Sequence, residues 1–485
     1  MKIRSVKFNF VMNFILTASS ILFPLITFPY ISRVLQATGN GKITFATSVL
    51  TYFTMFASLG IPTYGIRACA KVRDDKEKLS HLVQELMIIN TVTMLLTYAV
   101  FAVCVQLIPE FSAERELMWI NSISLVLNVF GVTWLYSALE QYAYITFCSL
   151  FFKIVSIVMM FLWVKNPADY VKYGAITVFA ASGSYVLNFI NLHKYVSLRK
   201  TGKYHFKQHL KPICIFFATS AAISVYTNLD VVMLRFMKDN AEVGYYNAAI
   251  KVKTVLVSLI TSLGTVLLPR LSFYVRAKDE KAFHDTIIKA FNFVLVLASA
   301  VTIYFMLFAN ETILVLSGKG YGPAVMPMIL LMPTVLLIGL SNITGIQVLT
   351  PINKEKEVLI SILYGAVLDF VLNLVLIPKF GASGASFATL TAEGIVLTVQ
   401  CIYLRKMLKD ILHELSLGKV GIASAVSLGV GIVLKNIVTL TPFVTICVTG
   451  IVFFAVYFLI LLIMRESFVA GIWDSVMDKV RGAGR

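Results

Sequence analysis

Charged residues are scarce in this chain of 485 residues. Asp, Glu, Lys and Arg make up 14% of it, whereas soluble domains carry about 25%. Apolar residues reach 58%, and the mean hydropathy is +0.83. The shortage of charge excludes an ordinary soluble enzyme and a disordered protein, and it indicates an all-α polytopic membrane protein.

Sequence motifs of common catalytic and metal sites are also missing. The sequence has no P-loop, no His-Glu-x-x-His motif and no Gly-x-Ser-x-Gly elbow. It therefore gives no reason to expect the reactions that those motifs catalyse. Its six cysteines stand apart without metal-ligand spacing and are expected to be small buried apolar residues. We expect that the protein is not an enzyme and that it holds no metal and no resident cofactor. Coupling of transport to protons or sodium is left open.

Apolar segments fill most of the chain between residues 9 and 464, and we interpret them as about fourteen membrane spans. Loops on the same side of the membrane as the N-terminus contain about three times as many Lys and Arg residues as loops on the opposite side. This bias predicts that both termini lie in the cytoplasm. The outer loops are too short for a catalytic domain. The net charge of +17 lies in short loops rather than on a basic stripe, so no nucleic acid is expected. Transport is the function class that remains.

Two junctions six spans apart share a pattern. Each has an arginine at the outer end of a span, Arg33 or Arg235, and a glycine eight or nine residues later, Gly41 or Gly244. Chance similarity between apolar helices is the alternative to a repeat. A parallel repeat predicts two six-helix bundles related by an axis along the membrane normal. The expected divisions are an N-terminal six-helix lobe (1–200), a C-terminal six-helix lobe (201–410) and two additional helices with a cytoplasmic tail (411–485).

Polar residues recur at helical spacing in the second span of each expected lobe. The stripe in span 245–268 consists of Asn247, Lys251, Thr254, Ser258, Thr261 and Thr265, and the one in span 43–65 of Thr44, Ser48, Thr51, Thr54 and Ser58. Such a stripe either packs against another helix or lines a wet cavity. Lys251 favours a cavity, because a charge at the bilayer centre costs at least ~3 kcal/mol.

Other charged residues within or near the spans are candidates for the same site. Lys153 and Lys253 lie within spans, whereas Arg33 can reach the headgroups and Arg67 can simply set the topology. The carboxylates that we expect to couple an ion or to neutralise a cation are Glu140, Asp230, Asp369 and Glu393. The excess of cations favours an anionic phosphate headgroup as cargo. A cationic drug would require an acidic, aromatic cavity instead.

Several segments resemble the Wzx-type oligosaccharide flippases of the multidrug, oligosaccharidyl-lipid and polysaccharide exporter superfamily. The segments that carry this resemblance are Phe28–Leu35, Gly39–Phe45, Gly60–Pro62, Gly65–Arg67, Leu229–Leu234 and Val243–Tyr246. The resemblance implies a V-shaped pair of six-helix lobes followed by two more helices. It also implies transfer of an undecaprenyl-diphosphate-linked oligosaccharide from the inner to the outer leaflet by alternating access.

The resemblance also implies a set of binding residues and partners. Cavity cations at Arg33, Arg67, Lys251 and Lys253 would hold the diphosphate, and we add Asn247 and Lys153 as substrate-binding candidates. We expect the partners to be a lipid-linked oligosaccharide, membrane lipids, a polysaccharide polymerase and glycosyltransferases, and the protein to be a monomer in a bacterial inner membrane. The alternatives are a peptidoglycan lipid-precursor flippase and an ion-coupled multidrug exporter. The short outer loops argue against a membrane polymerase or ligase.

Overall fold

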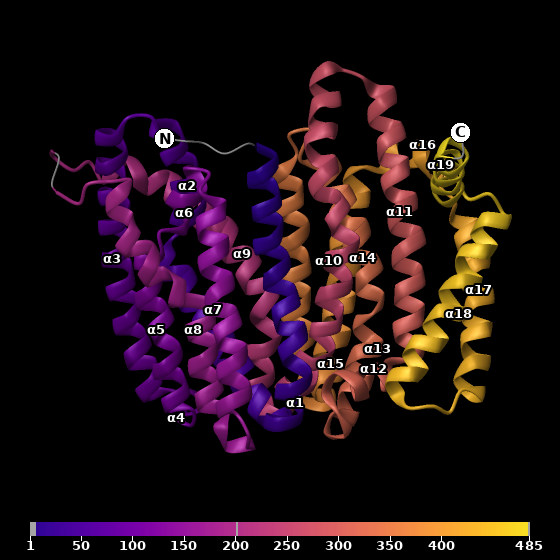
Figure 1. Ribbon diagram of the computed structural model, residues 1–485, viewed down its shortest axis with the longest axis horizontal. Helices are drawn as coiled ribbons and strands as arrows, with labels where there is room; N and C mark the ends of the chain where they lie inside the picture. Colours follow the sequence, from indigo (N-terminus) through magenta and orange to yellow (C-terminus); the bar gives the residue numbers. More distant parts are fainter. Residues whose placement is uncertain (1–5, 200–201, 484–485) are drawn as a thin grey trace. The chain divides into compact units, whose positions relative to one another are not determined.

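The computed structural model describes residues 6–199 and 202–483, and every regular element in these ranges is helical (Figure 1). The chain forms two compact units, Met1–Gly244 and Tyr245–Arg485. The division into lobes and tail proposed from the sequence stays a prediction.

The first unit contains nine α-helices and two short 3-10 turns within its described residues. They are α1 (Val6–Ser58), α2 (Ile61–Val72), α3 (Lys76–Leu107), α4 (Pro109–Ser112), α5 (Arg115–Gly131), α6 (Thr133–Ala138), α7 (Tyr142–Trp163), η1 (Pro167–Asp169), α8 (Tyr170–Asn191), η2 (Leu192–Lys194) and α9 (Lys207–Met237).

The second unit takes in all but the first turn of α10 and every element after it. These are α10 (Asn240–Ala277), α11 (Glu280–Leu307), α12 (Ala309–Ser317), η3 (Lys319–Ala324), α13 (Val325–Leu331), α14 (Pro333–Ser341), the π-helical η4 (Asn342–Leu349), α15 (Glu355–Tyr403), α16 (Arg405–Leu412), α17 (Leu417–Ile437), α18 (Pro442–Ile463) and α19 (Ser467–Ala483).

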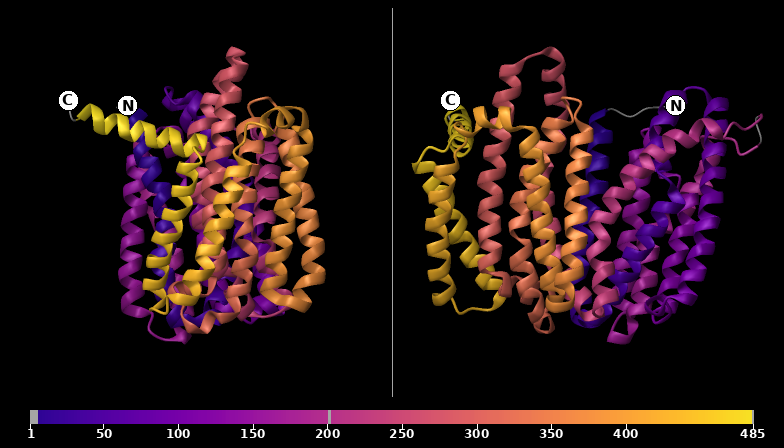
Figure 2. Two further views of the ribbon diagram at one scale, coloured as in Figure 1. Left: turned by 90° about the vertical axis from the view of Figure 1, so that its right-hand side faces the viewer. Right: turned by 180° about the vertical axis from the view of Figure 1, so that it is seen from behind.

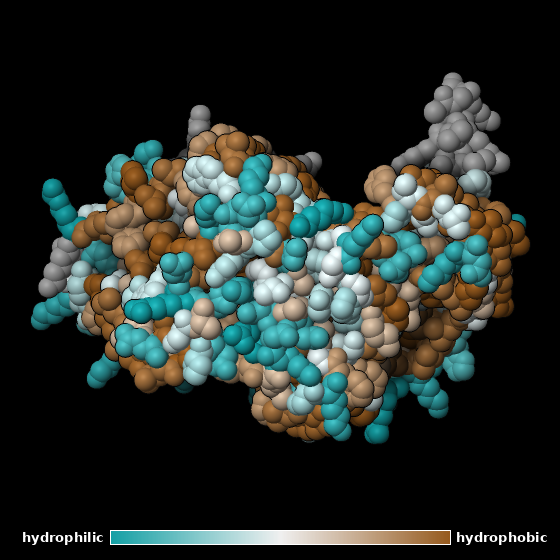
Figure 3. All heavy atoms as spheres, turned by 90° about the horizontal axis from the view of Figure 1, so that it is seen from below, coloured by the Kyte–Doolittle hydropathy of each residue, from teal (hydrophilic) through white to brown (hydrophobic). Residues whose placement is uncertain are grey.

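Within the described residues, twelve helical segments are long and apolar enough to cross a bilayer. Apolar side chains such as Leu107, Phe147 and Ile451 are exposed on these segments, as expected where lipid replaces water as the solvent. Figure 3 looks along the helices onto their ends, where hydrophilic side chains lie among apolar ones. The chain is a multi-pass membrane protein.

Two of these helices are too long for one straight crossing. α1 has 53 residues and α15 has 49, so each would extend about 75–80 Å against a hydrocarbon core of about 30 Å. Each is interrupted by one residue of non-helical backbone, Gln36 in α1 and Gly381 in α15. Figure 1 shows the indigo ribbon of α1 turning at its lower end. The fourteen crossings predicted from the sequence stay a prediction, which requires α1 and α15 to cross twice each.

The turn in α1 is followed by a close helix contact within Met1–Gly244. Asn40 donates a side-chain hydrogen bond of 3.1 Å to the carbonyl oxygen of Gln36. At the next residue, a Cβ atom on Gly41 would lie 1.6 Å from the carbonyl oxygen of Asn240. A Cβ atom on Gly244 would in turn lie 2.0 Å from the carbonyl oxygen of Ala37. The two glycines that the sequence repeat aligns therefore serve the same purpose, since each lets another backbone approach it.

Separate cores hold the helices of each unit together. In the first unit, one cluster of buried apolar side chains includes Ile31, Phe45 and Phe101, and another surrounds Trp134 and Tyr136. In the second, Tyr457 and Phe453 anchor clusters to which α11 and α18 contribute. Tyr457 also donates a hydrogen bond of 3.0 Å to the carbonyl oxygen of Val296, which satisfies its hydroxyl in an apolar setting.

The segment after residue 464, which the sequence assigns to a tail, contains helix α19. Glu466 precedes this helix, and its carboxylate accepts hydrogen bonds of 3.0 and 2.9 Å from the backbone amides of Phe468 and Val469. Such a carboxylate satisfies amides that have no partner within the helix. Figure 2 shows α19, in yellow next to the C-terminus, running across the direction of α17 and α18. Apolar residues of α18 and α19, among them Phe458 and Trp473, line a groove between the two helices.

Candidate functional site

The first unit contains a pocket of about 490 Å³ lined by 17 residues. Eleven of them carry a side-chain hydroxyl or amide: Thr47, Thr51, Thr54, Ser58, Thr63, Asn121, Ser124, Asn128, Thr177, Ser220 and Ser224. The remaining six are Leu50, Met55, Gly60, Pro62, Val178 and Ala181, so none of the 17 is charged. The volume lies within the range of about 300–1,000 Å³ that is usual for small-molecule sites.

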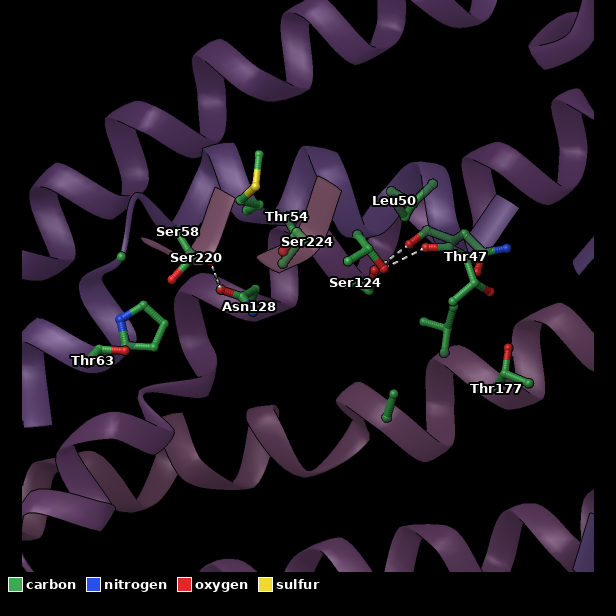
Figure 4. Close-up of a pocket in the computed structure, with 17 residues that line it drawn as sticks. Thr47, Leu50, Thr54, Ser58, Thr63, Ser124, Asn128, Thr177, Ser220 and Ser224 are labelled. Carbon is green, nitrogen blue, oxygen red and sulfur yellow. Dashed lines mark hydrogen bonds between the residues drawn. The ribbon is translucent and has the colours of Figure 1, made fainter. Parts of the chain in front are cut away.

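Five helices contribute to this pocket. Its polar residues come from α1, α2, α5, α8 and α9, and Figure 4 shows them facing a common space. The turn from α1 into α2 depends on Gly60, whose φ of 73° is left-handed. A Cβ atom there would also lie 2.5 Å from the backbone nitrogen of Phe217 in α9. Glycine is therefore required both for the turn and for the approach of α9 to the pocket.

Several hydroxyl groups of the pocket donate hydrogen bonds to oxygen atoms of the protein itself. Thr51 donates to the carbonyl oxygen of Thr47 at 2.9 Å, and Ser124 donates to that of Asn121 at 2.7 Å. Ser58 donates to Oδ1 of Asn128 at 3.0 Å, which joins α1 to α5 (Figure 4). A hydroxyl that has donated its single proton can still accept hydrogen bonds through its lone pairs. The pocket thus offers acceptors to a ligand.

The polar stripe predicted in span 43–65 lies partly in this pocket. Thr51, Thr54 and Ser58 line it, whereas Thr44 and Ser48 do not. The sequence interpretation missed the other eight polar residues of the lining. Some of them had a usable signal: Asn121, Ser124 and Asn128 are spaced three and four apart, and Ser220 and Ser224 are four apart, so each set lies on one face of its helix.

None of the cations predicted in the first unit lines the pocket. Arg33 is exposed on α1, where its guanidinium donates to the carbonyl oxygen of Pro29, and Arg67 is exposed on α2. Lys153 of α7 donates to the hydroxyl oxygens of Ser19 and Ser20 at 2.9 and 3.0 Å. These three cations lie on three different helices, α1, α2 and α7.

The cations predicted in the second unit lie on α10. Lys251, Lys253 and Asn247 are all partly buried. Along the same stripe, the hydroxyl of Thr254 donates to the carbonyl oxygen of Ile250 at 2.8 Å. Thr265, the last residue of the predicted stripe, has a side chain outside the described residues. Within the described part of the chain, none of the ion pairs involves Lys153, Lys251 or Lys253.

The four predicted carboxylates occupy different settings. Glu140 forms an ion pair of 2.8 Å with Arg73 and accepts a hydrogen bond of 3.3 Å from Asn9. Asp230 is buried on α9. Asp369 and Glu393 are buried on α15, on opposite sides of the break at Gly381. Asn373 donates to Asp369 at 3.2 Å, as their spacing of one helical turn predicts.

Sequence interpretation also missed a buried network around Glu85 in the first unit. His209 of α9 contacts Glu85 of α3 at 2.8 Å through Nε2, while its Nδ1 lies 2.8 Å from the hydroxyl of Tyr64 in α2. His81 lies 3.4 Å from the same carboxylate, and the backbone amide of His205 donates to it. Side chains of α2, α3 and α9 thus join in one network around this carboxylate, and no local sequence pattern reveals it.

Comparison with known proteins identifies a family that the sequence matches. Residues 6–275 match the model of the family described as "Polysaccharide biosynthesis protein". The chain is 25% identical over 406 residues to a putative O-antigen transporter of Escherichia coli (strain K12), covering 83% of this chain and 97% of that one. A putative O-antigen transporter of Shigella dysenteriae is 24% identical over 396 residues, covering 80% and 98%.

Solved structures share the fold. The lipid II flippase MurJ, in an inward closed conformation, matches with a TM-score of 0.75 at 15% identity, covering 94% of this chain and 99% of that one. An inward-facing multidrug resistance transporter of the MATE family, from the MOP superfamily, matches with a TM-score of 0.63 at 13% identity, covering 80% and 95%. The resemblance indicated by the sequence motifs and the predicted fold class are confirmed.

Proposed function

The chain belongs to the polysaccharide biosynthesis protein family, and from this premise we propose that it is a flippase for a lipid-linked oligosaccharide. The observation that carries the proposal is the similarity to O-antigen transporters over nearly their whole length. We place the protein in a bacterial inner membrane with both termini in the cytoplasm, as the loop charges favour. The likeness to MurJ and to the MATE transporter concerns the fold alone.

The proposed cargo is an oligosaccharide on undecaprenyl diphosphate, moved from the inner to the outer leaflet by alternating access. Lys251 is the residue that we expect to matter most for the diphosphate. It lies on the polar stripe of α10, and no recorded ion pair within the described residues compensates it. An ammonium group kept at bilayer depth without a carboxylate favours an anionic ligand as its partner. Lys253, Asn247, Lys153, Arg33 and Arg67 are the further candidates.

A substitution at Lys251 tests this proposal. In cells that lack their own flippase, we expect the intact chain to restore surface polysaccharide and Lys251→Ala to reduce it about tenfold, the value of one charge-assisted hydrogen bond. Surface polysaccharide per cell is the readout, normalised to the amount of protein in the membrane. Lys281→Ala is the matched control, because Lys281 is exposed at the start of α11.

Two outcomes would contradict parts of the proposal. Full activity of Lys251→Ala would remove the role of this lysine in holding the diphosphate. A chain that rescues only cells depleted of their peptidoglycan-precursor flippase would reassign the cargo to that lipid, which was an alternative from the sequence. Resistance to cationic dyes without any polysaccharide export would favour the multidrug exporter.

A further inference from the structure

We infer that the uncharged pocket of the first unit binds the sugar hydroxyls of the transported lipid, separately from the cations that hold its diphosphate. The inference rests on the proposed function and identifies which part of the cargo this pocket recognises. The name "hydroxyl pocket" denotes the 17 residues that line it, from Thr47 to Ser224.

The absence of charge in the hydroxyl pocket decides against the diphosphate. None of its 17 residues carries a charge, and an anion taken out of water needs cations or several strong donors to compensate the loss of hydration. Arg33, Arg67 and Lys153, the cations predicted in this unit, are absent from the lining, and Lys153 donates to Ser19 and Ser20 instead. The pocket therefore suits a neutral ligand.

The orientation of the hydroxyl groups favours a ligand that donates hydrogen bonds. Thr51, Ser58, Ser124 and Thr177 all donate to oxygens of the protein, at 2.9, 3.0, 2.7 and 2.7 Å. Their lone pairs are what they present to the pocket. A phosphate offers acceptors alone, whereas each sugar hydroxyl carries a donor. Oxygen ligands without a carboxylate are also compatible with a sodium ion, so sodium belongs in the test.

The positions of the lining residues explain why a sugar site would form here. Ser58 bonds across to Asn128, so the acceptor groups of α1 are fixed relative to α5. Gly60 and Pro62 at the adjacent turn keep that end of the pocket free of large side chains. Preorganised hydrogen-bonding groups of this kind determine the orientation of a ligand, and they reduce the ordering cost of binding.

The experiment compares two lipids on the purified full chain in nanodiscs. One is undecaprenyl diphosphate, and the other is the sugar-bearing undecaprenyl diphosphate isolated from the strain in which the chain restores polysaccharide. The test variant is Thr51→Val combined with Ser124→Ala. The matched control is Thr17→Val combined with Ser475→Ala, because these exposed hydroxyls also donate to backbone carbonyls, those of Asn13 and Gly471, but lie outside the pocket.

We expect the test variant to bind the sugar-bearing lipid about tenfold more weakly, as the loss of one or two hydrogen bonds implies. Its affinity for undecaprenyl diphosphate should match that of the intact chain and the control. An equal loss for both lipids, no loss for either, or a loss that appears only when sodium is present would each overturn the inference. If the intact chain binds neither lipid, the proposed function itself fails. The other outcomes leave the proposed function unaffected.

Discussion

Replacing Gly41 with alanine is expected to destabilise the first unit strongly. The added Cβ atom would lie 1.6 Å from the carbonyl oxygen of Asn240 and 2.6 Å from its carbonyl carbon. Backbone atoms cannot rotate away as a side chain can, so the helices must separate. Overpacking usually costs about 1–3 kcal/mol, and we expect a value at or above the upper end. The midpoint of thermal unfolding in detergent provides the measurement.

A glycine in an open position supplies the control for this experiment. A Cβ atom on Gly394 of α15 would meet no heavy atom within 4 Å among the described residues, and Gly394 has no positive φ. Gly394→Ala should therefore leave the midpoint unchanged or raise it slightly, since alanine favours helix. Gly244→Ala should behave like Gly41→Ala, because its Cβ would meet the carbonyl oxygen of Ala37 at 2.0 Å. Equal midpoints for Gly41→Ala and Gly394→Ala would show that the close contact does not form.

Replacing His209 with alanine is the second change for which we expect a large effect. The buried carboxylate of Glu85 would lose its contact with Nε2, and the hydroxyl of Tyr64 would lose its partner at Nδ1. A buried charge-assisted contact that loses one member costs about 3 kcal/mol. We expect the midpoint of thermal unfolding at neutral pH to fall accordingly, together with weaker attachment of α9 to α2 and α3.

A second substitution separates the carboxylate from simple loss of packing. Adding Glu85→Gln to His209→Ala should recover part of the lost stability, because the neutral amide no longer requires a charged or donating partner. His193→Ala is the control, since His193 is exposed and contacts the carbonyl oxygen of Ile190. If the double variant is no more stable than His209→Ala, the carboxylate is not the source of the loss.

Most of the fold class follows from composition, whereas the candidate site follows only in part. Apolar runs separated by short basic loops restrict a chain to membrane helices, because only helices and closed barrels satisfy the backbone in lipid. Helical spacing also identified Thr51, Thr54 and Ser58 as one face, and these three line the hydroxyl pocket. Lys251 was singled out by the cost of a charge at bilayer depth, and its role stays a prediction.

Long-range contacts explain what the sequence interpretation missed. Glu85 and His209 are 124 residues apart, and Ser58 and Asn128 are 70 apart. A periodic pattern defines which face of a helix is polar, but it does not say which other helix that face meets. The helix after residue 464 was missed for a different reason. α19 is too polar to resemble a membrane span, yet its sequence is amphipathic and it forms a helix that contacts α18.

The sequence by itself determined a helical membrane protein with paired glycines, polar stripes and more cations than acids, because composition and periodicity are local properties of the chain. Tertiary structure alone decided that five helices gather eleven neutral polar side chains around one pocket without any of the predicted cations. The physical reason is that helix packing is set by the fit of whole surfaces, with glycines such as Gly41 and Gly60 determining how closely backbones approach.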